Sequence, residues 1–351
     1  MKIAVDAMGG DRAPLQIVEG ILHCLPELDE DVTIVVVGKL DEIKKAFDGR
    51  EEEWANRLEF VEAPDSIEMK ESPIEALRTK PYNSISVSTK LVKDGLVDAV
   101  MSAGNTGAMV GSASLQLGKL DGVQKAGIAA VIPTPSGQSI LLDVGANVNC
   151  RSAHLVQYAA MGAVMFGKLF SKEKPTVGLL SVGAESGKGN LIVKDAVKML
   201  EAAKDHDDLP FEFAGQVEGH YVMAGKVDVI ICDGFTGNVL LKFAEAVNEN
   251  FLSVFKNTIT SIVENKNGES KIFNEIFSEV APKFDWSAFG GAELLGIKGT
   301  TMIAHGRSNK RAIASAIKIC AKMVKHSIQK HIQDVIHKVN TLLIKTMVNS
   351  G

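Results

Sequence analysis

The sequence predicts an α/β protein in which a mostly parallel sheet lies between layers of helices. Short apolar runs rich in valine and isoleucine alternate with amphipathic stretches along most of the chain, as in parallel sheets with helical connections. Most of these runs end in a polar loop that contains glycine. Aromatic residues make up only 5% of the chain and glycine contributes 32 of 351 residues, which favours many short loops over a β-sandwich.

The strands are predicted from their continuous apolar character. Val32–Val37 has too many consecutive valine and isoleucine residues to leave one face in water, so it belongs inside a sheet. Ile128–Ile132 and Ile140–Asp143 are joined by the turn PTPSGQ and are expected to be neighbours. The other predicted strands are Lys2–Asp6, Val97–Met101, Thr176–Val182 and Val227–Cys232. Because ligands bind beyond the carboxyl ends of parallel strands, we expect the polar loops to share one edge.

The predicted helices follow the loops. Pro14 suits the first turn of a helix that runs through His23. Further helices are predicted from SAGNTGA to Leu117, over Ser152–Phe170, from GAESGKGN to Ala203, and from DGFTGN to Asn250.

Two helical features stand outside this alternation. Apolar residues at helical spacing predict a hairpin of helices 251–264 and 270–280, inserted at about 243–288. Near the C-terminus, apolar positions from Ile313 to Leu342 predict one long amphipathic helix. The chain is long enough for one large domain or two. We expect residues 1–330 to form a single α/β catalytic domain and residues 331–351 a basic helical extension.

Charge is unevenly distributed along the chain. The net charge is −5, but residues 309–351 contain eight Lys or Arg and one acid, which gives that segment +7 and the remainder −12. This favours an acidic partner or an anionic membrane surface, or else a solvated helix face. Cys24, Cys150, Cys232 and Cys320 form no CxxC pair, which indicates buried free thiols and a soluble or peripheral cytoplasmic protein.

The loop GAESGKGN is the best anion-binding candidate. Only three residues separate Gly183 from Gly187, and Gly189 stands where a Walker motif needs Ser or Thr, so a nucleotide triphosphatase is excluded. A backbone-rich loop before a helix, with Lys188 beside it, favours a bound anion. A plain turn with a surface lysine is the alternative. The chain has no GxGxxG after a strand, which argues against a Rossmann cofactor.

Other polar residues are candidates for a site at the same edge. Asn105 and Thr106 begin one predicted helix, and Thr236 and Asn238 begin another, although such residues also cap helices. Asp6, Asp143 and Asp233 each end a strand, where they can hold loop N–H groups or act in catalysis. His305 is the best acid–base candidate. With no HExxH, HxH or GxSxG motif, neither a metal site nor a serine nucleophile is predicted.

Taken together, these motifs resemble those of the bacterial phosphate acyltransferases. KIAVDAMGGDRAP, MSAGNTGA, LLDVGANV, KGN, CDGFTGNV, GGAELLG and AHG occur in the family's order over about residues 1–330. The resemblance implies a three-layer α/β/α fold like that of phosphotransacetylase and isopropylmalate dehydrogenase. It implies transfer of an acyl group from acyl carrier protein to inorganic phosphate for phospholipid synthesis. It also implies a homodimer without cofactor, metal or nucleic acid, which contacts the inner face of the membrane and supplies a membrane-bound glycerol-3-phosphate acyltransferase.

The resemblance and the loops together predict the site residues. Lys188, Asn238 and His305 are predicted to be catalytic. The predicted substrate- and phosphate-binding residues are Asp6, Asp11, Asn105, Thr106, Asp143, Asn147, Gly187, Gly189, Asn190, Asp233 and Thr236.

The chain departs from the family pattern at several places. His220 and Tyr221 replace an Arg–Asp pair, Glu293 stands where proline is usual, and Arg307 stands where a small residue is common. The last twenty or so residues extend beyond the usual end. These differences bear on substrate preference and carrier docking more than on the reaction class.

The chemistry needs no protein nucleophile. Phosphate has its second pKa near about 6, so it is largely dianionic at neutral pH and can attack a thioester itself. The leaving thiol, with a pKa of about 8.5, departs without a strong acid. Two alternatives stay open: a phosphotransacetylase that acts on coenzyme A thioesters, and a non-catalytic membrane scaffold that docks acyl carrier protein.

Overall fold

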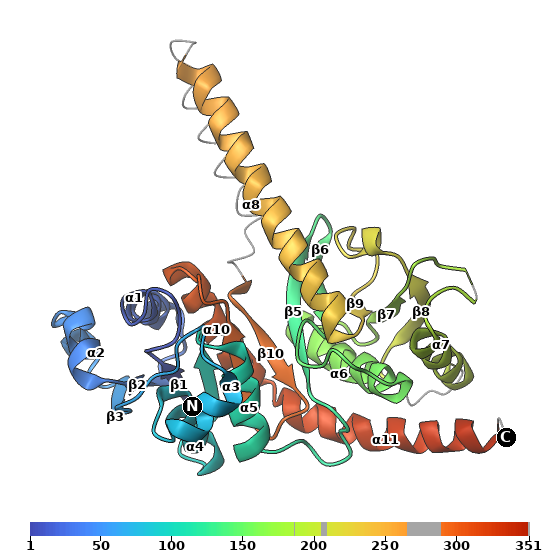
Figure 1. The fold of residues 1–351 in the computed structure, drawn as a ribbon, viewed down its shortest axis with the longest axis horizontal. Coiled ribbons are helices and arrows are strands. Elements are labelled where there is room, and N and C mark those ends of the chain that lie inside the picture. The colour runs from blue at the N-terminus through green and yellow to red at the C-terminus, as the bar shows by residue number, and fades with distance from the viewer. Residues whose placement is uncertain (186, 205–208, 265–288, 350–351) are drawn as a thin grey trace.

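The computed structural model describes residues 1–185, 187–204, 209–264 and 289–349 (Figure 1). Its centre is an eleven-stranded sheet of order β3-β2-β1-β4-β11-β10-β5-β6-β9-β7-β8. The strands are β1 Lys2–Asp6, β2 Thr33–Gly38, β3 Leu58–Glu62, β4 Ala99–Ser102, β5 Gly127–Thr134, β6 Gly137–Leu142, β7 Thr176–Leu180, β8 Glu212–Val217, β9 Val229–Ile231, β10 Gly291–Leu295 and β11 Thr300–Ala304.

The sheet confirms the predicted α/β class. Among the described residues, seven of the ten strand pairings are parallel. The three antiparallel pairings are β11–β10, β10–β5 and β5–β6, in the middle of the sheet. Strands β6, β9, β7 and β8 therefore run opposite to β3, β2, β1, β4 and β11. The expectation that the carboxyl ends of all the strands share one edge of the sheet is wrong, because the two groups of strands run in opposite directions.

Helices cover both faces of the sheet. Along β4, Ala99 and Met101 face one core while Val100 faces another, as expected of strands buried on both sides. Helices α1, α2, α6, α7, α10 and α11 pack on the first face, and α3, α4, α5 and the base of α8 on the second. Their bounds are α1 Leu15–Cys24, α2 Leu40–Phe47, α3 Pro73–Thr79, α4 Ser84–Lys93, α5 Thr106–Gln116, α6 Ser152–Phe170, α7 Leu191–Ala203, α8 Gly234–Glu264, α10 Lys310–Lys325 and α11 Ile328–Asn349.

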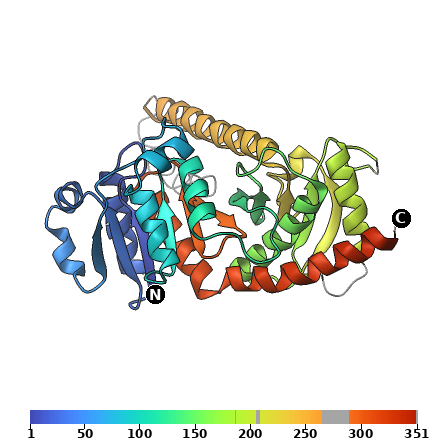
Figure 2. The ribbon, with the colours of Figure 1, turned by 60° about the horizontal axis from the view of Figure 1, so that its bottom comes forward.

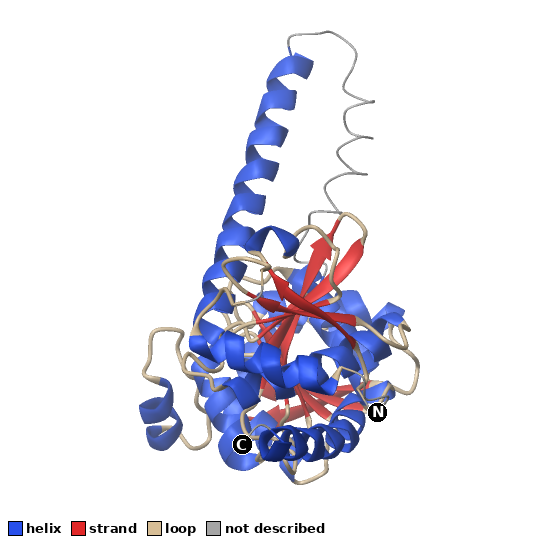
Figure 3. Cartoon of the chain, turned by 90° about the vertical axis from the view of Figure 1, so that its right-hand side faces the viewer, coloured by secondary structure: helices blue, strands red, loops and turns tan. Residues whose placement is uncertain are grey.

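Helix α8 is an arm that leaves the body of the molecule. It continues for 31 residues, past the predicted end at Asn250, and extends outward in both Figure 1 and Figure 3. It therefore contains the first helix of the predicted hairpin. The second predicted helix, at 270–280, lies outside the described residues.

The predicted single C-terminal helix is wrong. Residues 310–349 form two helices, α10 and α11, which are separated at Ser327, where φ is 49°. The break lets α11 turn and lie along α6 and α7 (Figure 2). Its apolar face is buried there through Ile328, Ile332, Ile336, Val339 and Leu342. The C-terminal segment is thus part of the first helical layer.

The cysteines and the helices agree with two simpler expectations. All four cysteines are buried and unpaired. No helix in the described part of the chain is both long enough and apolar enough to span a membrane.

Candidate active site

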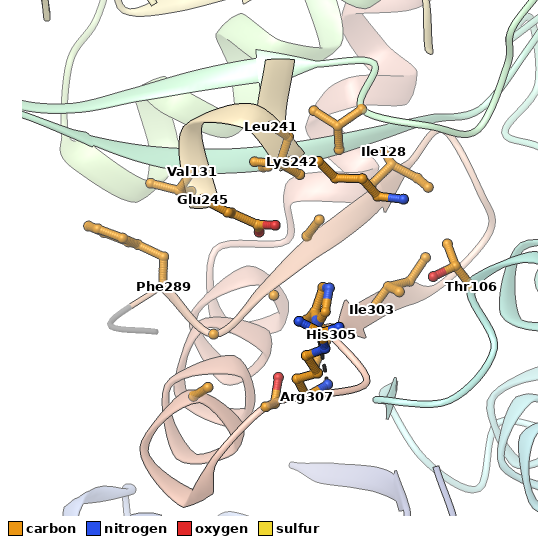
Figure 4. Close-up of a pocket in the computed structure, with 18 of the residues that line it drawn as sticks. Thr106, Ile128, Val131, Leu241, Lys242, Glu245, Phe289, Ile303, His305 and Arg307 are labelled. Atoms are coloured by element: carbon orange, nitrogen blue, oxygen red, sulfur yellow. Dashed lines mark hydrogen bonds between the residues drawn. The ribbon is translucent and has the colours of Figure 1, made fainter. Parts of the chain in front are cut away.

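A cavity of about 680 Å³ lies between α8, strands β5 and β10, and the loop that leads into α10 (Figure 4). Its polar or charged lining includes Thr106, Asn238, Lys242, Glu245, Asn248, His305, Arg307, Ser308 and Asn309. Its large apolar lining residues are Ile128, Val131, Val144, Leu241, Leu252, Phe289 and Ile303. Loops from both halves of the sheet therefore meet at one cavity, although they end strands of opposite direction.

Two glycines seat the start of α8 against the loop that follows β6. A Cβ at Gly237 would overlap the carbonyl oxygen of Asp143, and one at Gly234 would lie 2.8 Å from the carbonyl oxygen of Asn147. Only glycine lets the two backbones come this close. The side-chain amide of Asn238 consequently lies beside Gly145, 3.7 Å from where a Cβ would stand.

Asp233 and Thr236 are occupied in starting this helix. The Asp233 carboxylate accepts from the backbone N–H groups of Phe235 and Thr236 at 3.0 and 2.9 Å, and from the Thr236 hydroxyl at 2.8 Å. Asp233 thus caps α8. Asn238 makes no hydrogen bond with any described residue and lines the cavity, so its amide is available to a ligand.

Asp143 holds the loop beneath α8. Its carboxylate accepts from the backbone N–H groups of Ile128, Gly145, Ala146 and Asn147 at 2.8 to 3.1 Å. Burial raises its pKa, and these hydrogen bonds oppose the rise. The Asn147 amide donates in turn to the Asp143 carboxylate and the Ala126 carbonyl. Both side chains shape the site from below and neither lines the cavity.

Asp6 lies at the end of β1 in the other half of the sheet, as Asp143 lies just after β6. It is fully buried and accepts from the Ser102 hydroxyl at 2.6 Å and from the Met8 backbone N–H at 3.0 Å. Burial raises its pKa. The Asp11 N–H donates to the Gly306 carbonyl at 2.8 Å, which joins this loop to the one that carries His305.

Asn105 and Thr106 are adjacent but face different surroundings. The Asn105 carbonyl oxygen caps α5 by accepting from the Ala108 N–H, and its amide donates to the carbonyls of Glu68, Met69 and Glu71. Thr106 is exposed and lines the cavity. Of the two predicted residues, Thr106 is therefore the one placed to meet a ligand.

The proton on the His305 ring is placed by its own loop. The Arg307 backbone N–H donates to Nδ1 of His305 at 3.1 Å. In the neutral ring Nδ1 is thus the acceptor, which leaves the proton on Nε2. Figure 4 shows His305 and Arg307 on the same side of the cavity, so His305 is a hydrogen-bond donor available to a ligand.

Residues 187–190, in the loop after β7, do not line this cavity. Gly187 and Gly189 have φ of 92° and 89°, and the carbonyl of Lys188 accepts from the Gln216 amide at 2.8 Å. Asn190 caps α7 by accepting from the Val193 N–H at 2.9 Å. Lys188 is exposed, and neither it nor Asn190 lines the cavity.

Lys242 is the cavity residue that sequence reasoning missed. It extends from α8 into the cavity, one turn beyond Asn238 (Figure 4), and has no ion-pair partner among the described residues. Its spacing of four from Asn238 places both on one face of a helix. That spacing was visible in the sequence once Asn238 had been chosen.

Comparison with known proteins finds relatives over nearly the whole chain. A family model described as fatty acid synthesis protein matches residues 1–331. A phosphate acyltransferase from Dictyoglomus turgidum is 41% identical over 344 residues, which cover 97% of this chain and 98% of the relative. One from Thermodesulfovibrio yellowstonii is also 41% identical, over 338 residues, with 96% of this chain and 95% of the relative covered.

Solved structures of two further enzymes share the fold. A phosphotransacetylase from Streptococcus pyogenes superposes with a TM-score of 0.60 at 16% identity, covering 93% of this chain and 94% of its own. The EutD phosphotransacetylase from Staphylococcus aureus gives 0.57 at 15% identity, covering 92% and 94%. At this identity the likeness concerns the fold, whereas the family model and the relatives concern the whole sequence. The chain belongs to the phosphate acyltransferase family.

Proposed function

We propose that the protein transfers an acyl group from the thioester of an acyl carrier protein to inorganic phosphate, giving acyl phosphate and free carrier thiol for phospholipid synthesis. The observation that carries the proposal is the composition of the cavity. Polar side chains and cations, among them Asn238, Lys242 and His305, line the same cavity as several aliphatic side chains. An acyl phosphate has the same two parts, an anionic head and an apolar chain.

The reaction would proceed by direct attack. A phosphate oxygen attacks the thioester carbonyl carbon, the C–S bond breaks, and the thiolate leaves and takes up a proton. We assign Lys242 to the phosphate, and the Asn238 amide and the His305 Nε2–H to the developing oxyanion. Donors aimed at developing charge in a partly water-free cavity supply the largest share of such catalysis.

The remaining predicted residues would act at one step removed. We propose that Asp6, Asp143 and Asp233 keep the loops in place, since their carboxylates are bound to loop N–H groups. Lys188, with Gly187, Gly189 and Asn190, is proposed from the resemblance as an anion-binding loop. Asp11, Asn105 and Asn147 would support the walls of the site, and Thr106 and Thr236 would stand near the substrate.

A phosphotransacetylase that acts on coenzyme A thioesters is the second candidate function, because the solved structures with this fold include two such enzymes. The two candidates differ only in the thiol carrier. Comparing kcat/KM for acyl carrier protein and coenzyme A thioesters of one acyl chain separates them. A non-catalytic scaffold would turn over neither.

We propose a homodimer formed through α8. Phe235, Val239, Phe243, Val247 and Val254 are exposed and follow one another along the arm at intervals of four residues and, at the end, seven, so they form a stripe on one side of it. A second copy of the same helix would cover this stripe in an isologous interface.

The rest of the proposed biology follows from the product. An acyl phosphate carries an apolar chain and is prone to hydrolysis, so a cytoplasmic enzyme gains from peripheral contact with the inner face of the membrane. There a membrane-bound glycerol-3-phosphate acyltransferase would consume the product.

We propose that residues 1–330 act as one catalytic domain with its insert at 243–288, and that residues 331–351 are an extension of it. No role in nucleic-acid binding is proposed.

The test is the reaction itself. Incubation with acyl-acyl carrier protein and phosphate should yield hydroxylamine-trappable acyl phosphate. Asn238→Ala should lower kcat by about 10²–10³-fold with little loss of stability, because Asp233 and not Asn238 caps α8. Absence of acyl phosphate with the wild-type protein would refute the function, and a normal kcat in the variant would refute the role of Asn238.

A further inference from the structure

The mouth of the cavity is rimmed by exposed cations. Arg307 lines the cavity, and Lys310 and Arg311 follow it at the start of α10. Arg12 stands in the neighbouring loop, whose Asp11 N–H is bound to the Gly306 carbonyl. All four side chains are exposed. These residues, Arg12, Arg307, Lys310 and Arg311, are called the basic rim below.

The basic rim differs from Lys318 and Lys325, two cations further along α10, in having no ion-pair partners. Lys318 and Lys325 are bound to Glu27 and Asp29 at 2.8 and 2.6 Å. In the described part of the chain, no carboxylate lies within ion-pair distance of any rim residue. Asp11 lies beside the rim, and its single negative charge is smaller than the charge of the four cations, so the net charge stays positive. Lys318 and Lys325 are thus neutralised by the protein, whereas the two cations at the start of α10 are not.

A surface hollow of about 510 Å³ adjoins the cavity at the rim. It is lined by Leu15, Gln16, Glu19, Asn309, Lys310 and Arg311. Asn309 lines both this hollow and the cavity, so the two lie next to each other. Leu15 is 52% exposed and presents an apolar contact among the cations. Glu19 is paired with Arg50 at 2.8 Å, which reduces its opposition to an acidic ligand.

Two of the cations also stand where helix electrostatics disfavours them. Lys310 and Arg311 occupy the first two positions of α10, and its first turn contains no acid. The amino end of a helix carries positive partial charge, so anionic side chains are preferred there. Departures from local preference without a structural partner are expected at functional surfaces.

We infer that the basic rim and its hollow dock the acidic carrier protein that delivers the acyl thioester. Charge complementarity selects this occupant, because the unpaired cations of the basic rim attract an acidic protein, whereas the chain as a whole is acidic at −5. A cationic patch steers such a partner to one face and raises its association rate. Leu15 adds an apolar contact, and a carrier docked at the hollow would hold its thioester arm next to the cavity, because Asn309 lines both. The inference rests on the proposed function and names where its substrate binds.

The experiment reverses the two rim charges that line the hollow and do not line the cavity. In Lys310→Glu, Arg311→Glu, kcat/KM for acyl-acyl carrier protein should fall about tenfold or more, through KM. Turnover of a carrier-free acyl thioester, acyl-N-acetylcysteamine, should stay unchanged. The wild-type value for the carrier substrate should fall with added salt, and that of the variant should not. Thermal stability should be kept or raised, since both substitutions now suit the helix end.

A matched control carries the same change elsewhere. Lys44→Glu, Lys45→Glu on α2 replaces two exposed lysines and should leave both substrates unaffected. An equal fall for both substrates, or for neither, would overturn the docking site. So would loss of binding to anionic phospholipid vesicles with unchanged carrier kinetics, which would assign the rim to a membrane. If the wild type turns over no thioester, the proposed function fails. Docking can still be tested by titration with fluorescent acyl carrier protein, for which the rim variant should have a lower affinity than the wild type.

Discussion

Glu293 is buried in a way that indicates a bound proton. It lies on β10 with no exposed surface, and its Oε1 accepts from the Thr301 N–H and the Gln329 amide, each at 3.0 Å. Its Oε2 and the Gln329 Oε1 are both buried without a partner. A proton on Oε2 could join these two atoms and complete an acid–amide pair between the sheet and α11. Burial accordingly raises the pKa of Glu293 to about 8, from its usual 4.5.

Glu293→Gln should therefore stabilise the protein increasingly as pH rises. Between pH 4.5 and 8 the unfolded chain releases the glutamate proton while the folded protein retains it, so wild-type stability falls with pH. Each pH unit costs about 1.4 kcal/mol, which gives a ceiling of about 5 kcal/mol over the window. Glutamine cannot ionise, and its amide can donate where the proton did. The difference between variant and wild type should grow by about 2–3 kcal/mol from pH 6 to pH 8 and then level off.

Urea denaturation at pH 6, 7, 8 and 9, at one protein concentration, measures this difference. Glu30→Gln, at an exposed position with no ion pair among the described residues, is the control and should show no pH-dependent gain. A difference for Glu293→Gln that stays constant from pH 6 to pH 9 would show that Glu293 is already ionised in the folded protein. The acid–amide pair would then not exist.

Two further predictions concern the cavity and the arm. Lys242→Ala should lower kcat/KM for phosphate by about 10²–10³-fold. If this variant instead keeps near-normal activity while Lys188→Ala loses most of its activity, the phosphate site lies at the loop 183–190. Phe243→Asp, Val247→Asp should convert the proposed dimer into a monomer in light scattering, because two charges would enter an apolar interface. Ile74→Asp, at an exposed position away from the arm, should leave the dimer intact, and an unchanged dimer in the double variant would remove α8 from the interface.

Local pattern was a good guide to the elements and to the loops between them. Lys2–Asp6 and Ser152–Phe170 are observed at the predicted bounds, because both are long apolar or amphipathic runs with polar ends. The strands β3, β8, β10 and β11 were not predicted. In β10, Glu293 lies among apolar residues and obscures the pattern. Its burial depends on partners from β11 and α11, which no local window contains.

The division of the site also depends on long-range structure. Capping and ligand binding use the same residue types, so the sequence could not tell Asn105 and Asn190, which cap helices, from Asn238, which does not. The strand reversal at β10 and β5 is likewise invisible in the motifs, because parallel and antiparallel partners are chosen by distant segments. The chemistry of the loops was therefore predictable, and their grouping was not.

The placement of β11 has a consequence for how the chain is made. This strand, Thr300–Ala304, lies between β4 and β10, and the helix after it, α10, packs on α1. A ribosome has thus released about 300 residues before the amino-terminal strands can acquire their last neighbour. Until then β4 presents an open edge, which is a template for wrong pairing. Expression yield and chaperone dependence should therefore respond to changes near the carboxyl end of this chain more than its distance from the first strands would suggest.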